Sequence, residues 1–308
     1  MIILGKKHIF SDSELAYMQK IEGQVSWLTV SSRDINVLKT SIEEIISKHG
    51  LQTIIINTLH SQPNQTNELL TYLTHLELRG NKFITVENFM EKHLHKCYIP
   101  FDNSDLSYLE NIQPYTEFQY LQKRIIDYIG ALVLLLISWP IMLYTAYRIK
   151  KESPGPVFFK QTRVGINGDV FQCIKFRSMH VDGHHDPYTR DDDPRIFSFG
   201  NFIRKSRIDE LPQLFNVIKC EMHFIGPRAE WNILVEEYEK EIPFYQERHL
   251  VSPGITGNAQ VHYPYGRNID DTRQKLMYDF YYIKYWNIYQ EMIIILKTVN
   301  TVLGRRGL

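Results

Sequence analysis

The sequence has few cysteines, no excess of positive charge and no apolar leader at its start. The 3 cysteines among 308 residues (Cys97, Cys173 and Cys220) have no paired spacing, which argues against a disulfide framework or a CxxC zinc site and for a reducing compartment. The 35 Lys and Arg residues balance 35 Asp and Glu residues, so we expect no nucleic-acid partner. The first ten residues contain no apolar stretch of signal-peptide length, so we do not expect secretion.

Long apolar runs are also missing, with one exception. Residues 129–145 (IGALVLLLISWPIMLYT) carry no charge, and about 17 residues are close to the shortest helix that crosses a bilayer. Pro140 lies inside this run, where it removes a backbone donor and favours a bend. Basic residues flank the run on both sides: Lys123, Arg124, Arg148, Lys150 and Lys151. A straight span is expected to be basic on its cytoplasmic side only.

These features together favour a re-entrant membrane segment over residues 116–152. In this arrangement a helix enters the bilayer, bends near Ser138 and Pro140, and leaves through the same face. Two alternatives stay open from the residues alone. One is a helix buried in a protein core, and the other is a straight membrane span.

Residues 1–115 have the pattern of a small parallel α/β domain. Strands rich in β-branched residues alternate with helices of amphipathic spacing, at Ser26–Ser31, Asp34–His49, Leu51–Thr58, Asn67–Arg79 and Lys82–Val86. This order predicts a parallel sheet resembling a nucleotide fold, but no GxGxxG follows a predicted strand, so the dinucleotide fingerprint is absent. With 10 basic and 13 acidic residues, we interpret it as a structural or regulatory accessory domain, with a linker at residues 100–114.

We expect residues 153–308 to form a mixed α+β domain that begins with a β-hairpin. Val157–Gln161 and Val170–Phe176 read as two strands around a turn at Gly165–Gly168. Alternation along the second strand predicts that Lys175 and Arg177 lie on one face. A solvated edge strand explains these two cations equally well when they are considered alone.

Two adjacent carboxylates, Asp209 and Glu210, follow a cluster of three cations. Arg204, Lys205 and Arg207 lie within the five residues before Asp209. A lone Asp-Glu pair is usually found at a helix N-terminus, but carboxylates next to Arg and Lys stay ionised, as a nucleophile or a metal ligand must. Arginine forks also hold diphosphates, and Arg228 in a Gly-Pro-Arg turn adds a further guanidinium.

From about Leu121 to Leu308 the chain resembles the bacterial sugar transferases, which are monotopic phosphoglycosyl transferases that prime polyprenyl-phosphate carriers. The matching stretches, in order, are KRIIDYIGALVLLL, PGPVFFKQTRVG, IKFRSM, DDDPRIFSFGNFIRKSRIDELPQLFNVIKCEM, FIGPRAE, SPGITGNAQV and YPYGRN. The ending, YDFYYIK and ILKTVNTVLGRRG, is similar to the exopolysaccharide-priming branch. This resemblance implies transfer of sugar 1-phosphate from a nucleotide diphosphate sugar, usually a UDP-sugar, to polyprenyl (undecaprenyl) phosphate, with release of nucleoside monophosphate.

The resemblance also implies roles for individual residues. Asp209 is then the nucleophile that forms a covalent phosphosugar intermediate, and Glu210 helps to hold Mg²⁺. The basic positions expected near the phosphates and the nucleotide diphosphate sugar are Lys175, Arg177, Arg204, Arg207 and Arg228. The implied location is the bacterial inner (cytoplasmic) membrane, with the catalytic domain in contact with the lipid bilayer and facing the cytosol.

Several of these assignments have alternatives. A catalytically inactive membrane scaffold of the same fold is a second functional class, and a transferase that moves only the sugar would release nucleoside diphosphate instead. The histidine-rich loop at His180–Asp186 is interpreted as a solvated loop rather than a metal site. The aromatic residues of 278–289 favour interfacial C-terminal helices over core packing. The sequence is compatible with a homodimer at the membrane surface.

Overall fold

The computed structural model describes all residues except 30–34, 59–62, 102–111, 182–192, 264–267 and 304–308. The described residues divide into two compact units, Met1–Tyr98 and Ile99–Leu308. Each unit has its own sheets and its own hydrophobic core. The boundary between the units falls after Tyr98, just before the linker expected at 100–114. Most of that linker lies outside the described residues.

The first unit is built on a four-stranded parallel sheet. Its strands are β1 (Ile2–Leu4), β2 (Ser26–Leu28), β3 (Thr53–Ile56) and β4 (Lys82–Thr85), in the spatial order β2-β1-β3-β4. The connecting helices are α1 (Asp12–Glu22), α2 (Ile35–His49) and α3 (Pro63–Leu78), and α4 (Val86–Phe89) follows the last strand. The three strands, two helices and parallel pairing predicted from the sequence are confirmed. The central strand β1 and helix α1 were not predicted.

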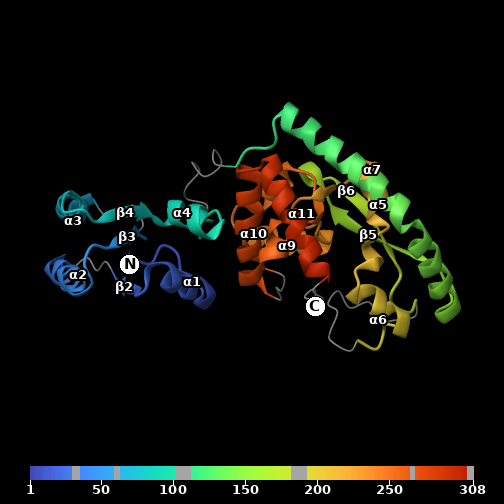
Figure 1. Ribbon diagram of the computed structural model, residues 1–308, viewed down its shortest axis with the longest axis horizontal. Coiled ribbons are helices and arrows are strands. Elements are labelled where there is room, and N and C mark those ends of the chain that lie inside the picture. Colours follow the sequence, from blue (N-terminus) through green and yellow to red (C-terminus); the bar gives the residue numbers. More distant parts are fainter. Residues whose placement is uncertain (30–34, 59–62, 102–111, 182–192, 264–267, 304–308) are drawn as a thin grey trace. The chain divides into compact units, whose positions relative to one another are not determined.

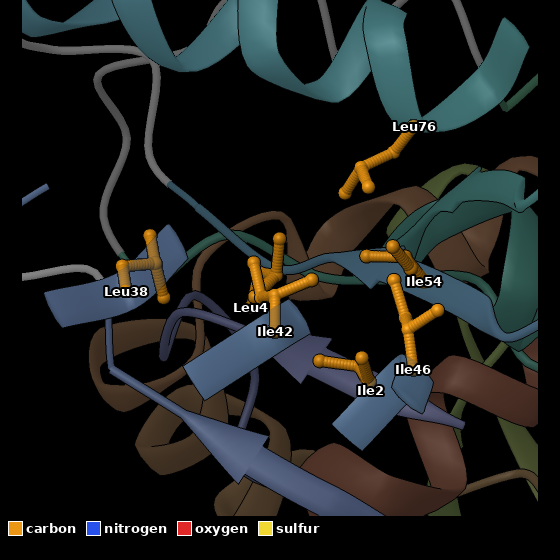
Figure 2. Close-up of a cluster of buried hydrophobic side chains, with 7 residues drawn as sticks. All are labelled: Ile2, Leu4, Leu38, Ile42, Ile46, Ile54 and Leu76. Carbon is orange, nitrogen blue, oxygen red and sulfur yellow. The ribbon is translucent and has the colours of Figure 1, made fainter. Parts of the chain in front are cut away.

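The core of this unit lies between the sheet and helices α2 and α3. Its buried side chains converge from β1, β3 and both helices, as Figure 2 shows for Ile2, Leu4, Leu38, Ile42, Ile46, Ile54 and Leu76. The α2 members recur every four residues, which places them on one helical face. The β1 members are two apart and therefore share one face of the sheet.

The carboxyl ends of β1 and β3 are tied together by one buried side chain. In doubly wound sheets, ligands bind at such a junction, where the strand order reverses. Here Asn57 accepts a 2.8 Å hydrogen bond from the amide of His8 and donates one of 2.8 Å to its carbonyl. Protein groups thus satisfy this polar side chain.

The second unit begins with one long helix, α5 (Glu117–Glu152), of 36 residues. Thr116 caps its start in a reciprocal arrangement with Gln119. Among the described residues it is the helix long and apolar enough to cross a membrane, and only 22% of its most apolar stretch is buried. One stripe packs on the protein: Lys123, Arg124, Asp127, Ala131, Ser138, Thr145 and Ile149. A core helix would be covered on more of its faces, so the core-helix alternative is disfavoured.

The segment expected to bend near Ser138 and Pro140 is one continuous helix, so the helix-break-helix form is not observed. α5 is helical through both Ser138 and Pro140, although its axis bends along its length (Figure 1). Proline removes only one donor from the helical ladder, and a bend relieves the clash of its ring with the preceding turn. The helix therefore accommodates Pro140 without ending there.

The basic cluster before the apolar run also has a different role from the one expected. Lys123 is fully buried and donates hydrogen bonds to Glu291, at 2.5 Å, and to Tyr282, at 2.8 Å. Arg124 is buried too and donates to the carbonyls of Cys220 and Met222. These cations fasten α5 to its own unit, so they are not a membrane-flanking cluster.

The predicted hairpin is confirmed. Strands β5 (Phe158–Val164) and β6 (Val170–Phe176) are antiparallel, with Val164 opposite Val170 across the turn. Downstream lie α6 (Ser198–Lys205), α7 (Gln213–Ile218), α8 (Asn232–Glu241), α9 (Asn258–His262), α10 (Ile269–Lys284) and α11 (Ile288–Leu303). A short parallel pair, β7 (His223–Ile225) and β8 (Gly254–Thr256), lies among them. This is the mixed α+β architecture expected for the second part of the chain.

The aromatic residues near the C-terminus divide between core and surface. Phe280, Tyr282 and Trp286 are buried, whereas Tyr289 is 76% exposed. The aromatic series as a whole is therefore not an interfacial belt, because Phe280 and Tyr282 on α10 and Trp286 just after it are buried.

Candidate active site

The two adjacent carboxylates lie in a short 3-10 helix, Ile208–Glu210, between α6 and α7. Arg207 immediately precedes it with φ 59° and ψ 14°, a left-handed conformation that is uncommon for residues with a side chain. Such a conformation costs free energy and persists where the surrounding structure fixes it. It redirects the chain between α6 and α7 so that Asp209 points inward and Arg207 stays exposed.

Asp209 is buried and incompletely bonded. It is 9% exposed, and its Oδ1 atom has no hydrogen-bond partner among the described residues. Burial and the neighbouring charge of Glu210 raise the pKa of Asp209 to about 6, against the opposing effect of the nearby cations Lys175, Arg204 and Arg207. At neutral pH this carboxylate is mostly ionised and has a free oxygen.

Glu210 is bound to cations instead. Lys175 Nζ lies 2.8 Å from Glu210 Oε1, and Arg207 Nη1 lies 3.8 Å from the same atom. Burial opposes ionisation of Glu210, but Lys175, Arg228 and Arg207 outweigh it and lower its pKa to about 2. The two carboxylates thus differ in state, because one is paired and the other is not.

Four of the five predicted basic residues surround this pair. Lys175 comes from the end of β6, Arg204 from the end of α6, and Arg207 from the turn between α6 and the 3-10 helix. Arg228 follows β7 and acts on Glu210 through its charge. The structure thus brings together cations from three separate stretches of the sequence.

Arg177 does not join them. Its buried guanidinium donates hydrogen bonds to the carbonyls of Ser153 and Pro156, each at 2.6 Å, and to the Ser153 hydroxyl. The strand ends at Phe176, so the alternation that placed Arg177 on the same face as Lys175 does not extend to it. Arg177 holds the end of α5 against the hairpin.

Sequence reasoning missed two charged residues beside Arg228. Glu230 has an oxygen 4.0 Å from Arg228 Nε and another 3.8 Å from Arg163 Nη1. Arg163 lies on β5 opposite Phe171, so strand alternation puts it on the same face as Lys175. Pairing the two predicted strands across their turn would have indicated this position.

The site has carboxylate oxygens that could bind a magnesium ion. Substrate phosphates would supply the other ligands of that ion. The described residues contain no group of three or more His, Cys, Asp or Glu side chains suited to hold a metal by themselves. Mg²⁺ commonly uses one or two carboxylates, with phosphates and waters as its other ligands. The unpartnered oxygen of Asp209 and the adjacent Glu210 fit that pattern. Most of the histidine-rich loop, at 182–192, lies outside the described residues.

Sequence comparison finds similar proteins whose names describe one class of transferase. The chain is 46% identical over 187 residues to a UDP-N-acetylgalactosamine-undecaprenyl-phosphate N-acetylgalactosaminephosphotransferase of Aeromonas hydrophila, covering 60% of this chain and 44% of that protein. Two UDP-glucose:undecaprenyl-phosphate glucose-1-phosphate transferases are also similar. The one from Xanthomonas campestris is 41% identical over 189 residues, with 60% and 39% coverage, and the one from Caulobacter vibrioides is 38% identical over 187 residues, with 59% and 70% coverage.

The match to the family's sequence model lies within the second unit and includes most of α5. The chain spans less than half the length of the first two relatives. The sequence model of the bacterial sugar transferases matches residues 118–305, which include every candidate site residue described above. Because this match covers more than half of the 308 residues, the chain belongs to the bacterial sugar transferase family.

Proposed function

We propose that this protein transfers sugar 1-phosphate from a UDP-sugar to undecaprenyl phosphate, giving undecaprenyl-diphosphate-sugar and UMP. The names of the similar proteins support this class of reaction. The single observation that carries the proposal is the contrast within the carboxylate pair. Asp209 is buried with an unpartnered oxygen, while Glu210 beside it is neutralised by Lys175. A free carboxylate next to a fixed cation cluster suits attack on a diphosphate.

Two displacements at one phosphorus make up the proposed reaction. In the first, a carboxylate oxygen of Asp209 forms a bond to the phosphorus that carries the sugar. The bond from that phosphorus to the bridging oxygen breaks, and UMP leaves with the bond electrons. In the second, a phosphate oxygen of undecaprenyl phosphate attacks the same phosphorus and releases the Asp209 carboxylate. No net redox change occurs, and the enzyme returns to its starting state.

The cations have a defined task in this scheme. Lys175, Arg204, Arg207 and Arg228 surround the carboxylates, where they bind and orient the diphosphate and stabilise the charge on the leaving phosphate. Glu210 would help to hold Mg²⁺ together with the substrate, and the ion would further neutralise the diphosphate.

Membrane attachment through α5 supplies access to the lipid substrate. Both ends of α5 contact the same folded unit: Arg124 Nη2 donates to Cys220 O at 2.9 Å, and Glu152 Oε1 accepts from the amide of Phe199 at 2.9 Å. A bilayer cannot separate the ends of a helix that both touch one unit. This supports a monotopic arrangement, in which α5 enters and leaves the inner membrane from the cytosolic side.

The proposed reaction is tested by the nucleotide that it releases. Membranes containing the protein are incubated with undecaprenyl phosphate, Mg²⁺ and a panel of UDP-sugars, and the nucleotide products are separated. UMP formed with one sugar supports the proposal. Release of UDP would identify a transferase that moves the sugar alone, and no nucleotide release with any sugar would contradict catalysis.

A further inference from the structure

The chain segment that presents Arg228 is held by four consecutive carbonyl groups. The carbonyl of Pro227 accepts from Gly254 N at 2.9 Å, and that of Glu230 accepts from Val164 N at 3.1 Å. Between them, the carbonyl of Arg228 accepts from Arg248 Nη2 at 2.9 Å, and that of Ala229 accepts from Arg163 Nη1 at 2.8 Å. The outer two bonds are ordinary main-chain pairing. The inner two are made by guanidinium groups from distant parts of the sequence.

The Arg248 contact is the more deeply buried of the two. The residue is 5% exposed, and its Nη2 atom lies 3.0 Å from Asp279 Oδ2. Its Nη1 atom donates to the hydroxyl of Tyr245. A buried charge is costly to the folded state unless it is paired, and Asp279 of α10 provides the opposite charge. The guanidinium is therefore fixed from three sides, with one nitrogen shared between Asp279 and the main chain at Arg228.

We propose that Arg248, held by Asp279, is a positioning residue that fixes the main chain at Arg228 so that the Arg228 guanidinium is directed at the substrate diphosphate. This inference rests on the proposed function, in which Arg228 binds phosphate. The Arg248 side chain touches the carbonyl of Arg228 and acts through that residue alone. Lysine does not reproduce this arrangement, because one ammonium nitrogen replaces two guanidinium nitrogens. Of those, Nη1 reaches Tyr245, and Nη2 reaches Asp279 and the Arg228 carbonyl.

A purely structural role is the competing explanation, and a double-mutant cycle separates the two. Arg248→Lys should lower kcat/KM for the UDP-sugar by about 10- to 100-fold, as expected when a binding group is misplaced by a fraction of an ångström to one ångström. In an Arg228→Gln background the same change should cost less than about threefold, because the group that it positions is already gone. An equal loss in both backgrounds would overturn the proposal, as would full activity of Arg228→Gln.

Two further variants keep the result interpretable if Arg248→Lys folds poorly. Asp279→Asn retains the shape of the pair but removes its charge, and should show the same dependence on Arg228. Arg79→Lys is the control, because Arg79 also pairs with a carboxylate, that of Glu43 in the first unit, through hydrogen bonds of 2.6 and 3.0 Å. It should leave kcat/KM unchanged. A loss with Asp279→Asn that persists in the Arg228→Gln background would also overturn the proposal.

We call the hydrogen bonds of Arg248 to Asp279 and to the Arg228 carbonyl the clamp. Amide hydrogen exchange tests whether the clamp holds the main chain, without requiring turnover. The amides of Val164 and Gly254 bond to the two carbonyls that flank the clamped ones, so both should exchange faster in Arg248→Lys than in wild type. The amide of Asn57, bonded to Leu4 O in the other unit, should not change. Unchanged exchange at Val164 and Gly254 would overturn the clamp. If the wild type releases no UMP with any UDP-sugar, the proposed function fails while this measurement still decides the clamp.

Discussion

Lys175 and Glu210 are 35 positions apart in the sequence, yet Lys175 Nζ lies 2.8 Å from Glu210 Oε1. The contact joins the end of β6 to the 3-10 helix that carries both acidic residues. It also separates the tasks of two adjacent carboxylates, because the lysine neutralises Glu210 and leaves Asp209 Oδ1 without a partner. The proposed chemistry depends on this difference between Asp209 and Glu210.

Removing the cation at this contact should weaken both binding and catalysis. Lys175→Gln is expected to lower kcat/KM for the UDP-sugar by about 100-fold or more, since it removes a charge from the phosphate site and leaves Glu210 less neutralised. Lys160→Gln is a matched control on the same hairpin. Lys160 is exposed and lies opposite Ile174, so it occupies the other face of the sheet. Equal losses in the two variants would contradict the assignment.

Asp209→Asn should abolish turnover while the protein stays folded. The expected loss in UMP release is about 1,000-fold or more, because the amide cannot act as the nucleophile. The folded state holds Asp209 at a pKa of about 6, above its ordinary value of 3.8, so ionised Asp209 destabilises the folded state at pH 8. The melting temperature of Asp209→Asn at pH 8 should therefore equal or exceed that of wild type.

Asp169→Asn provides the comparison for that variant. Asp169 is exposed in the hairpin turn, and its substitution should leave UMP release and the melting temperature near their wild-type values. Near-normal activity of Asp209→Asn would remove the nucleophile from the mechanism.

The pH dependence follows from the same carboxylate. Because only ionised Asp209 attacks, kcat/KM should be level above pH 7 and fall by about tenfold for each pH unit below about 6. Glu210→Gln removes one of the charges that raise the pKa of Asp209, so the acid limb of its residual activity should move to lower pH. The same variant should respond less to Mg²⁺. An acid limb that stays in place would show that a different group titrates.

Cysteine labelling tests the membrane arrangement. Leu121 is 56% exposed and Lys151 is exposed, so each is a suitable labelling position near one end of α5, whereas the buried Lys123 is not. In a Cys220→Ser background, an impermeant maleimide should label Leu121→Cys and Lys151→Cys only when the cytosolic face is accessible. Leu136→Cys, in the middle of the apolar run, should stay unlabelled. Labelling of the two ends from opposite faces would contradict the arrangement.

Much of the fold could be predicted from the sequence where the pattern is local. The strands β3 and β4, helix α2 and the β5–β6 hairpin all follow from β-branched runs, helical spacing and glycine turns. Strand β1 was missed because three apolar residues at the start of a chain carry no periodicity, even though Ile2 and Leu4 lie at the centre of the core. The pairing that makes β1 central is a tertiary property.

In the site, too, local patterns could be predicted from the sequence and tertiary contacts could not. Asp209, Glu210 and the four cations were predicted as site residues from the resemblance and from their clustering in sequence, and the structure brings them together. Arg177 was assigned wrongly because strand alternation was extended past the end of β6. Lys123 was interpreted as a membrane flank because its partner, Glu291, is 168 positions away, and no local pattern predicts such a pair.

The most direct test of the account is the intact mass of the protein quenched during reaction with Mg²⁺ and the UDP-sugar that supports UMP release. A species heavier by one sugar phosphate should accumulate when undecaprenyl phosphate is withheld and disappear when it is added. The adduct should map to the peptide containing Asp209 and be absent from Asp209→Asn. A turning-over enzyme that carries no such adduct under any quench condition would contradict the covalent mechanism.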